Sequence, residues 1–345
     1  MGEIDQRIIL IAGFFANSLL GLGQFNLGYE ESFFLDFDQG GSLRMATVGG
    51  FNNPQFSEID LDGDSYLDLF VFDRNMDTWR TFLYNPSSLR YDYKPEYESQ
   101  FPTSLAELVL LRDFNCDSAP DIFTYYVGGF KVFRNDGAFP PSFSLEVEKI
   151  QTDYGTLKTS LYLLPGDVPA ITDVDNDGDL DILTFGNGDS ENTIVWHQNR
   201  SMDEYGNCDS LKFEVVTHCW GGVEEPPNQS QLEAIACRPV SPPSGDGTHA
   251  ARHHPGSSVL LIDSDGDNDK DLILGDIQTD RLVYAPNIGD EISAEIDVTQ
   301  QTTAFPNTAD PAAMQYMISG YEIDANKDGK MDLVLVPNNN IDSTC

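Results

Sequence analysis

Short apolar runs recur along most of the chain and are separated by stretches rich in Asp, Asn and Gly. Runs of about four to eight β-branched, aromatic and leucine residues, bounded by turn residues, are typical of β-strands. Long helical patterns are scarce. Five of the runs directly follow an acidic stretch: LFVF (69–72), IFTYY (122–126), ILTF (182–185), LILG (272–275) and LVLV (333–336). This pattern predicts an all-β protein.

The five runs have strand-like neighbours on both sides. Before the acidic stretches come SEI (57–59), LVLL (108–111), PAIT (169–172) and VLLI (259–262). After a turn come WRTFLYN (79–85), GFKVFRN (129–135), NTIVWHQN (192–199) and DRLVYAPN (280–287). Each of these second runs ends in Asn. The sequence therefore predicts a repeating unit of strand, acidic loop, strand, turn and strand, with room for a fourth strand.

The acidic stretches are themselves repeats of nine residues. They read DLDGDSYLD (60–68), DFNCDSAPD (113–121), DVDNDGDLD (173–181), DSDGDNDKD (263–271) and DANKDGKMD (324–332). All five place Asp or Asn at loop positions 1, 3, 5 and 9. Their starts lie roughly 60 residues apart, except that the fourth is displaced by an insertion of about 30 residues. Such regularity indicates one function repeated along the chain.

Calcium binding explains carboxylates at this spacing. Ca²⁺ takes about six to eight oxygen ligands in a flexible geometry, whereas Mg²⁺ prefers to keep waters in a strict octahedron. We expect the side chains at positions 1, 3, 5 and 9 and the backbone carbonyl at position 7 to be the ligands. They are Asp60, Asp62, Asp64, Tyr66 and Asp68; Asp113, Asn115, Asp117 and Asp121; Asp173, Asp175, Asp177, Asp179 and Asp181; Asp263, Asp265, Asp267, Asp269 and Asp271; and Asp324, Asn326, Asp328, Lys330 and Asp332.

An EF-hand is the nearest rival, and it requires a bidentate Glu at position 12 between two helices. Position 12 holds Val71, Thr124, Thr184, Leu274 and Leu335, so the EF-hand is rejected. The loops also differ in where glycine falls: position 4 in the first and fourth loops, position 6 in the third and fifth. The second loop has no glycine, so we expect it to bind weakly or to stay empty. For one loop alone, a solvated acidic turn would be the better interpretation.

Charge and composition agree with bound cations. The chain has 345 residues, 57 acidic and 19 basic, for a net charge of −38. A nucleic-acid partner is therefore excluded, because phosphate binding needs a basic face. Self-repulsion on this scale destabilises a compact state, and up to five Ca²⁺ ions would relieve it. At 40% hydrophobic residues the chain can still bury a proper core.

The N-terminus and the cysteines predict export. Residues 8–22 form an apolar run that ends in small residues, so residues 1–23 are interpreted as a signal peptide; a buried helix or strand is the alternative. No later segment is long and apolar enough to span a membrane. Cys208, Cys219 and Cys237 cluster and could supply one disulfide of unknown pairing, whereas Cys116 and Cys345 are isolated.

The acidic loops and their spacing resemble the FG-GAP/VCBS repeat family over roughly residues 45–340. The resemblance implies an integrin-alpha-like β-propeller of four-stranded blades, usually about seven, with Ca²⁺ held in a loop between strands. The repeats would occupy residues 24–345 and make five units, or six with residues 25–55. Since the last strong strand lies close to Cys345, we expect a truncated chain or an open partial propeller.

The long gap before the fourth loop contains an insertion at 201–257. Its cysteines and the histidines His218, His249, His253 and His254 make a zinc site conceivable, but the spacing fits no familiar zinc pattern. A disulfide-pinned surface excursion is the stronger interpretation.

The motifs of common enzymes are missing from the chain. GxSxG, HExxH and a phosphate-binding glycine loop do not occur, and the aspartates are better explained as ligands than as a glycosidase pair. We therefore expect no catalytic residue. The predicted function is a secreted or cell-surface adhesion module that binds an extracellular protein or glycan. The alternatives are a carbohydrate-binding propeller, with Trp79 and Trp196 as stacking platforms, and an accessory domain of a polysaccharide-degrading enzyme.

Overall fold

The structure is a computed structural model of the whole chain. It describes residues 35–37, 41–43, 48, 50–186, 192–226, 231–242, 256–277, 279–306, 308, 311–314 and 317–337. The expected signal peptide lies outside these residues, as does Cys345. The chain divides into two units, Met1–Gly50 and Phe51–Cys345. In the first unit, strands β1 (Leu35–Phe37) and β2 (Gly41–Leu43) form an antiparallel hairpin.

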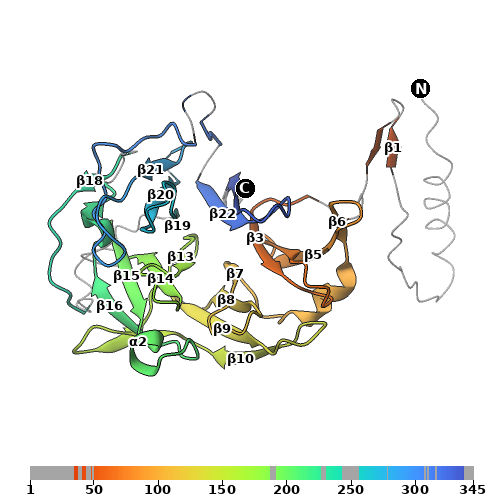
Figure 1. Cartoon of the computed structure of the whole chain (residues 1–345), viewed down its shortest axis with the longest axis horizontal. Helices are drawn as coiled ribbons and strands as arrows, with labels where there is room; N and C mark the ends of the chain where they lie inside the picture. Colours follow the sequence, from red (N-terminus) through yellow and green to blue (C-terminus); the bar gives the residue numbers. More distant parts are fainter. Residues whose placement is uncertain are drawn as a thin grey trace, which may run out of the picture. The chain divides into compact units, whose positions relative to one another are not determined.

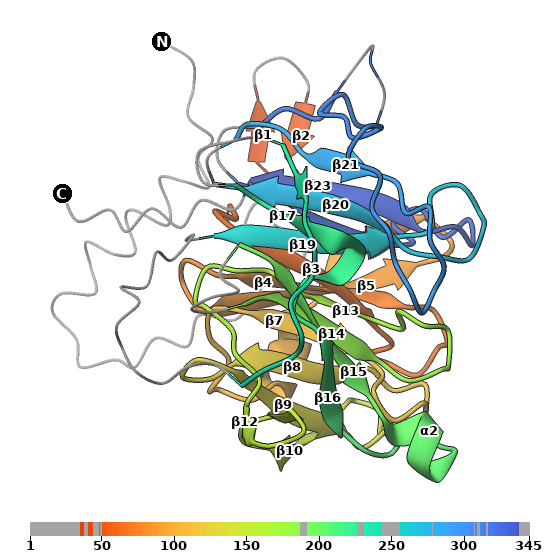
Figure 2. The same cartoon turned by 90° about the vertical axis from the view of Figure 1, so that its left-hand side faces the viewer.

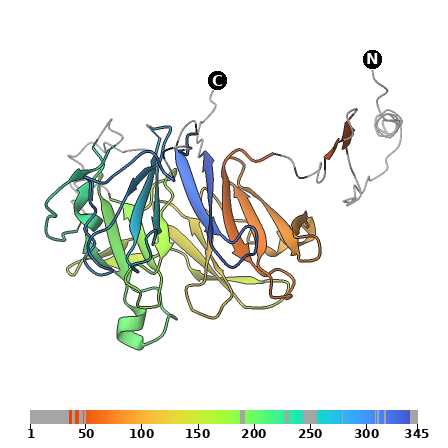
Figure 3. The same cartoon turned by 45° about the horizontal axis from the view of Figure 1, so that its top comes forward.

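The second unit is a β-propeller (Figure 1; Figure 3). The first blade consists of β3 (Pro54–Ile59), β4 (Asp68–Asp73), β5 (Thr78–Asn85) and β6 (Arg90–Tyr93). The second consists of β7 (Val109–Arg112), β8 (Asp121–Tyr125), β9 (Phe130–Asn135) and β10 (Phe143–Val147). The third consists of β13 (Ala170–Thr172), β14 (Asp181–Phe185), β15 (Ile194–Asn199) and β16 (Phe213–Thr217), extended by β11 (Gln151–Asp153) and β12 (Lys158–Ser160).

Two more sheets complete the ring of the described residues. The fourth blade has β19 (Ser257–Ile262), β20 (Asp271–Asp276) and β21 (Val283–Ala285). A two-stranded sheet of β22 (Ile318–Ile323) and β23 (Asp332–Pro337) follows. The remaining elements are the α-helix α2 (Ser201–Tyr205), the β17–β18 ribbon (Val223–Glu224 and Glu233–Ala234) and the 3₁₀ helices Pro95–Gln100 and Trp220–Gly222.

The predicted repeating unit is confirmed, and its register is the same in every sheet. The residue before each acidic loop pairs with the ninth loop residue on the next strand. These pairs are Ile59–Asp68, Arg112–Asp121, Thr172–Asp181, Ile262–Asp271 and Ile323–Asp332. Each acidic loop is therefore the hairpin connection between the inner strand of a sheet and its second strand.

The blade count differs from the sequence expectation. The described residues form four blades of three or more strands and the sheet β22–β23, not part of an open seven-bladed ring. The inner strands β3, β7, β13, β19 and β22 surround the centre (Figure 1), and β22 contacts both β19 and β3. The ring is thus closed between its last and first sheets, a contact between residues far apart in sequence that no local pattern reveals.

The hydrophobic core lies between neighbouring sheets. Between the first and second blades, Phe70 and Phe72 of β4 pack in one cluster with Val109 and Leu111 of β7. Between the third and fourth, Leu183 of β14 joins a cluster with residues of β19 and β20. The alternation expected of half-buried strands is visible in β3, whose residues are alternately half-buried and buried. A cavity of about 230 Å³ lies among the inner strands.

The predicted bounds of the insertion, 201–257, are wrong. They include β16, which is the fourth strand of the third blade. The insertion does hold the expected disulfide, between Cys219 and Cys237. A second disulfide joins Cys116 to Cys208 across 92 residues, although Cys116 had been taken as isolated. These cysteines cannot ligate zinc while they are bonded to one another. His249, His253 and His254 lie outside the described residues.

Among the described residues, the structure contains no helix of the length and apolarity that a bilayer crossing requires.

A nearly buried ion pair holds the ring closed. The side chains of Glu58 on β3 and Lys327 in the last acidic loop are each 10% exposed and form a salt bridge. Glu58 Oε2 also accepts a hydrogen bond of 3.0 Å from the Asp324 amide. The Lys327 ammonium lies 5.7 Å from the centre of the Tyr91 ring. The first and last sheets are therefore joined by charge as well as by apolar contact.

We predict that Lys327→Met destabilises the protein by about 3 kcal/mol, because it leaves the Glu58 carboxylate buried without its cation. Denaturant unfolding measures the change. In the double variant Glu58→Gln/Lys327→Met the uncompensated charge is gone, so the loss of stability should be smaller than in the single variant. Equal losses in the two variants would show that the ion pair does not contribute to ring closure.

Candidate metal centre

The five acidic loops share one backbone frame. The carboxylate at position 1 accepts a hydrogen bond from the amide of position 6 in every loop. The pairs are Asp60–Ser65 at 3.0 Å, Asp113–Ser118 at 2.7 Å, Asp173–Gly178 at 3.1 Å, Asp263–Asn268 at 3.1 Å and Asp324–Gly329 at 2.9 Å. The carboxylate at position 5 likewise accepts from the amide of position 7, at 2.9–3.1 Å. These bonds curl each loop so that its carboxylates converge.

Two positions of the frame have left-handed backbone in all five loops. Position 4 has φ between 58° and 84°, and position 6 has φ between 68° and 102°. Each glycine-containing loop has its glycine at position 4 or at position 6, but the backbone is left-handed at both positions in every loop. Ser65 and Lys327 adopt it without being glycine, at φ of 72° and 60°. The hydrogen bonds of the frame offset the strain, which is greater for such residues than for Gly or Asn.

The ninth residue has a structural role that the sequence did not reveal. In the first four loops it is at most 1% exposed. One carboxylate oxygen accepts from the amide of position 2 and the other from an amide at the end of the third strand. For Asp121 these donors are Phe114 at 3.1 Å and Asn135 at 2.8 Å. Asn199 and Asn287 are the corresponding third-strand donors to Asp181 and Asp271. In the first blade the donor to Asp68 is the Tyr84 amide, so the Asn at the end of the third strand marks the donor only in the second, third and fourth blades.

Burial changes the acidity of these ninth residues. Desolvation raises the pKa of Asp68 and of Asp121 to about 7, against hydrogen bonds from two amides that lower it. Desolvation also raises the pKa of Asp181, to about 9, and repulsion from the carboxylates of Asp175 and Asp179 raises it further. Each carboxylate therefore resists ionisation unless a cation is near.

Three loops gather their carboxylates closely enough to hold one ion. The groups are Asp60, Asp62 and Asp68; Asp173, Asp175 and Asp177; and Asp263, Asp265 and Asp267, each with ligand oxygens within 4.8 Å of one another. The sequence pattern predicts Asp64, Asp181 and Asp271 as further side-chain ligands, but these three residues are not members of the close carboxylate groups. Asp64 lies outside its group although it accepts from the amide of position 7, as Asp177 and Asp267 do. The structure thus supports the first, third and fourth loops as candidate sites.

The third loop fits a cation best. Asp173 Oδ1, Asp175 Oδ1, Asp177 Oδ2 and Asp179 Oδ1 are all buried and have no hydrogen-bond partner. Buried carboxylate oxygens without a donor are costly, and an oxygen-only set of this kind suits a hard cation such as Ca²⁺. The Asp179 side chain was missed by the sequence, which assigned only its carbonyl. It is 1% exposed, and burial raises its pKa to about 6.

The first and fourth loops are more open. Asp62 in the first loop and all three grouped carboxylates of the fourth are exposed to solvent. In the fourth loop, Asp269 at position 7 is 5% exposed, and burial together with Asp267 raises its pKa to about 6. Water can therefore solvate these carboxylates when no ion is present, unlike those of the third loop.

In the second loop, protein groups approach the carboxylate at position 5. The Asn115 amide donates to Asp117 Oδ2 at 2.9 Å, and Arg134 lies 3.9 Å from the same oxygen. Amide and guanidinium donors satisfy this carboxylate, which reduces its attraction for a cation. The geometry supports the prediction that this loop binds weakly or stays empty.

In the fifth loop, the Asp324 amide and the Lys327 side chain bind Glu58, whereas the Asp324 carboxylate accepts from the Asp328 and Gly329 amides. Asn326, Asp328 and Lys330 are exposed. Asp324, Asp328 and Asp332 do not form a close carboxylate group among the described residues. This loop is therefore a weaker candidate than the sequence indicated.

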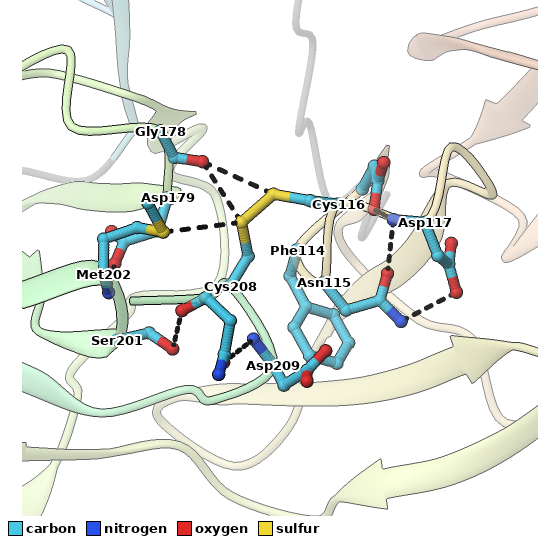
Figure 4. Close-up of a disulfide and its surroundings, with 12 residues drawn as sticks. Phe114, Asn115, Cys116, Asp117, Gly178, Asp179, Ser201, Met202, Cys208 and Asp209 are labelled. Atoms are coloured by element: carbon cyan, nitrogen blue, oxygen red, sulfur yellow. Dashed lines mark hydrogen bonds between the residues drawn. A yellow bond between two sulfur atoms is a disulfide. The ribbon is translucent and has the colours of Figure 1, made fainter. Parts of the chain in front are cut away.

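The third loop is also the one in contact with both of its neighbours. Asn176 donates to the Asn268 carbonyl of the fourth loop at 2.7 Å. The Cys116–Cys208 disulfide joins the second loop to the segment after α2, and both sulfurs lie 3.4 Å from the Gly178 oxygen (Figure 4). The three loops form one continuous rim.

Comparison with known proteins adds little to this geometry. No family model matches the sequence, and no curated protein does. Among solved structures, an Agrocybe aegerita lectin described as recognising non-reducing terminal N-acetylglucosamine is similar, with 16% sequence identity and a TM-score of 0.38. The match covers 82% of this chain, which spans about 60% of that structure's length. At this level of similarity the comparison carries no argument about ligand.

We predict that the ion-free protein is more stable at about pH 6.5 than at about pH 8.5. Asp68, Asp121 and Asp181 have folded pKa values above the unfolded value of 3.8, so the folded state holds extra protons in this range. Their contribution to stability is present at low pH and is lost as the pH rises through about 7 to 9.

Thermal unfolding in the presence of a chelator measures this dependence, and Asp121→Asn should reduce it. A melting temperature that falls on acidification within this window would contradict the prediction. The window ends near pH 6.5 because below it the buried His197, whose pKa burial lowers to about 3, begins to act in the opposite direction.

Proposed function

We propose that the chain is an exported, calcium-stabilised β-propeller of the FG-GAP/VCBS type that acts as a non-enzymatic binding or adhesion module. The observation that carries the proposal is the set of four buried carboxylate oxygens without donors in the third loop. A divalent cation there would satisfy all four at once. The shared frame of the other loops extends the proposal to the first and fourth sites.

The role proposed for Ca²⁺ is structural. The loop carboxylates belong to the connection between the inner and second strands, so an ion among them would fix that connection. The ligand chemistry consists of oxygen alone, which favours Ca²⁺ over Zn²⁺, and the exposed, irregular sets of the first and fourth loops favour it over Mg²⁺. Each ion also offsets two of the 38 net negative charges.

Export is supported by the cysteines of the described residues. Four of them form two disulfides, Cys116–Cys208 and Cys219–Cys237. Disulfides persist in oxidising compartments and are rare in the cytosol. The proposed location is therefore extracellular or at the cell surface, in agreement with the signal peptide expected at residues 1–23.

An extracellular protein is proposed as the ligand ahead of a glycan. Trp196 is 2% exposed and packs in the core between the third and fourth blades, so it offers no face to a sugar. Trp79 is half-buried, and its ring nitrogen donates to the Glu98 carbonyl at 2.8 Å. The two aromatic platforms expected for carbohydrate stacking therefore serve the fold. A glycan ligand would need other residues.

We predict that chelation lowers the melting temperature by on the order of 10 °C and that added Ca²⁺ restores it. Each site contributes about 2.7 kcal/mol when free Ca²⁺ exceeds its Kd a hundredfold. Differential scanning calorimetry in chelator, Ca²⁺ and Mg²⁺ measures the effect, with Mg²⁺ restoring less. An unchanged melting temperature in chelator, together with no metal in the purified protein, would refute the proposed function.

The third and second loops supply a matched pair of variants. Asp177 and Asp117 occupy the same loop position and cap the same backbone amide, at 3.0 and 2.9 Å. Asparagine keeps an oxygen for that bond and removes the charge. We predict that Asp177→Asn lowers the calcium-dependent gain in melting temperature, whereas Asp117→Asn leaves this gain unchanged. Equal effects would show that the two loops bind the ion equally well.

A further inference from the structure

Residues 200–212 form a small cap between β15 and β16 that lies against the third acidic loop. The cap contains α2, which sits at the end of these strands (Figure 2). Asn199 Oδ1 accepts from the Lys212 amide at 3.1 Å, and Ser201 Oγ donates to the Asn207 carbonyl at 2.7 Å. These bonds close the segment on itself, so the cap is a compact structure.

The cap contacts the third loop through its main chain and its cysteine. The Met202 amide donates to Asp179 Oδ2 at 2.8 Å, which leaves Asp179 Oδ1 as one of the four oxygens without a donor. The Cys208 sulfur lies 3.4 Å from the Gly178 carbonyl (Figure 4). The cap therefore holds Asp179 and Gly178 of the third loop in place.

A covalent bond fastens this cap to the neighbouring blade. Cys208 in the cap is bonded to Cys116, which is residue 4 of the second loop. The Cys116 residue is exposed and Cys208 is 7% exposed, so a reductant can reach the bond from the Cys116 side. The second loop, whose Asp117 carboxylate is satisfied by Asn115 and Arg134, thus contributes an anchor to the site beside it.

The contrast with the fourth loop shows what the cap does. Asp263, Asp265 and Asp267 are exposed, whereas their counterparts Asp173, Asp175 and Asp177 are half-buried and have buried oxygens without donors. The two loops have the same backbone frame and the same ligand types at positions 1, 3 and 5. Their difference in burial therefore comes from residues outside the two loops: the cap contacts Asp179 and Gly178, and Gln198 of β15 donates to Asp175.

We infer that the disulfide-anchored cap makes the third loop a tight, slowly exchanging Ca²⁺ site, and that Cys116, Cys208 and Met202 are positioning residues for it. This inference rests on the proposed function. With the cap in place, one oxygen of each of four carboxylates is buried without a donor in the ion-free loop, so that state is high in free energy and binding gains more. If the disulfide is opened, water reaches the loop, the ion-free state becomes less unfavourable and the affinity falls. Release of the ion also becomes faster.

The test uses the whole protein and compares two double variants, Cys116→Ser/Cys208→Ser and Cys219→Ser/Cys237→Ser. Calcium titration calorimetry measures affinity, and stopped-flow mixing of the Ca²⁺-loaded protein with a chelating dye measures release. We expect one tight, slowly released class of site in the unchanged protein. The first variant should weaken this class by about 10- to 100-fold and speed its release, as for other groups that position metal ligands. The second variant should leave the class intact.

A second measurement keeps the inference testable if the first variant folds poorly. In the Cys219→Ser/Cys237→Ser background, a thiol-free reductant acts on Cys116–Cys208 in protein that has already folded, and circular dichroism checks that it stays folded. Reduction should cause the same loss of the tight class and leave the weaker class, assigned to the first and fourth loops, unchanged.

The outcomes separate the inference from the proposed function. Calcium binding that includes a tight class unaffected by serine substitution and by reduction would overturn the inference and leave the proposed function standing. Absence of calcium binding in the unchanged protein would refute both. Weakening of all classes together after reduction would also overturn the inference, because it would show general loosening in place of an effect on one loop.

Discussion

Each blade depends on one buried carboxylate, that of the aspartate at the ninth loop position. In the first four loops this group accepts one amide from the loop and one from the end of the third strand, so three consecutive segments are tied to a single side chain. Because one slipped residue would direct the side chain to the other face of the sheet, the carboxylate also fixes the register of the hairpin. The constraint is electrostatic: a desolvated negative group must be surrounded by donors, and the backbone is arranged to provide them. The converging carboxylates at earlier loop positions follow from the same frame.

Identical spacing does not produce identical sites. The third loop has buried oxygens without donors, the fourth has the same residue types exposed to water, and the second satisfies its central carboxylate with Asn115 and Arg134. These differences arise from Asn115 within the second loop and from residues outside the loops, on neighbouring strands and in the segment after β15. A repeat motif therefore defines where cations are able to bind, while the surroundings decide how strongly each position competes with water.

The sequence predicts the features that depend on residues close together in the chain. Apolar runs on either side of a nine-residue hairpin connection predicted the first three strands of each of the four blades and β23 of the fifth sheet, and the oxygen-rich positions predicted the candidate sites. It was insufficient where distant segments meet. The contact of β22 with β3 closes the ring, and Cys116 reaches Cys208 across 92 residues, neither of which leaves a periodic signal. The aromatic Trp196 was a candidate for ligand stacking, yet its strand places it in the core. The side chain of Asp179 was overlooked because it occupies a position where only the carbonyl was expected to matter.

The left-handed residues at loop positions 4 and 6 have a consequence for how such chains are recognised. Only two of the five loops carry glycine at position 6, and only two carry it at position 4, although all ten positions adopt the same conformation. A consensus that demands glycine at one fixed position would detect two of the five repeats, whereas one written in backbone angles would detect them all. The residues at these positions can therefore vary while the backbone conformation stays the same. Proteins with this loop frame need share few residues with one another.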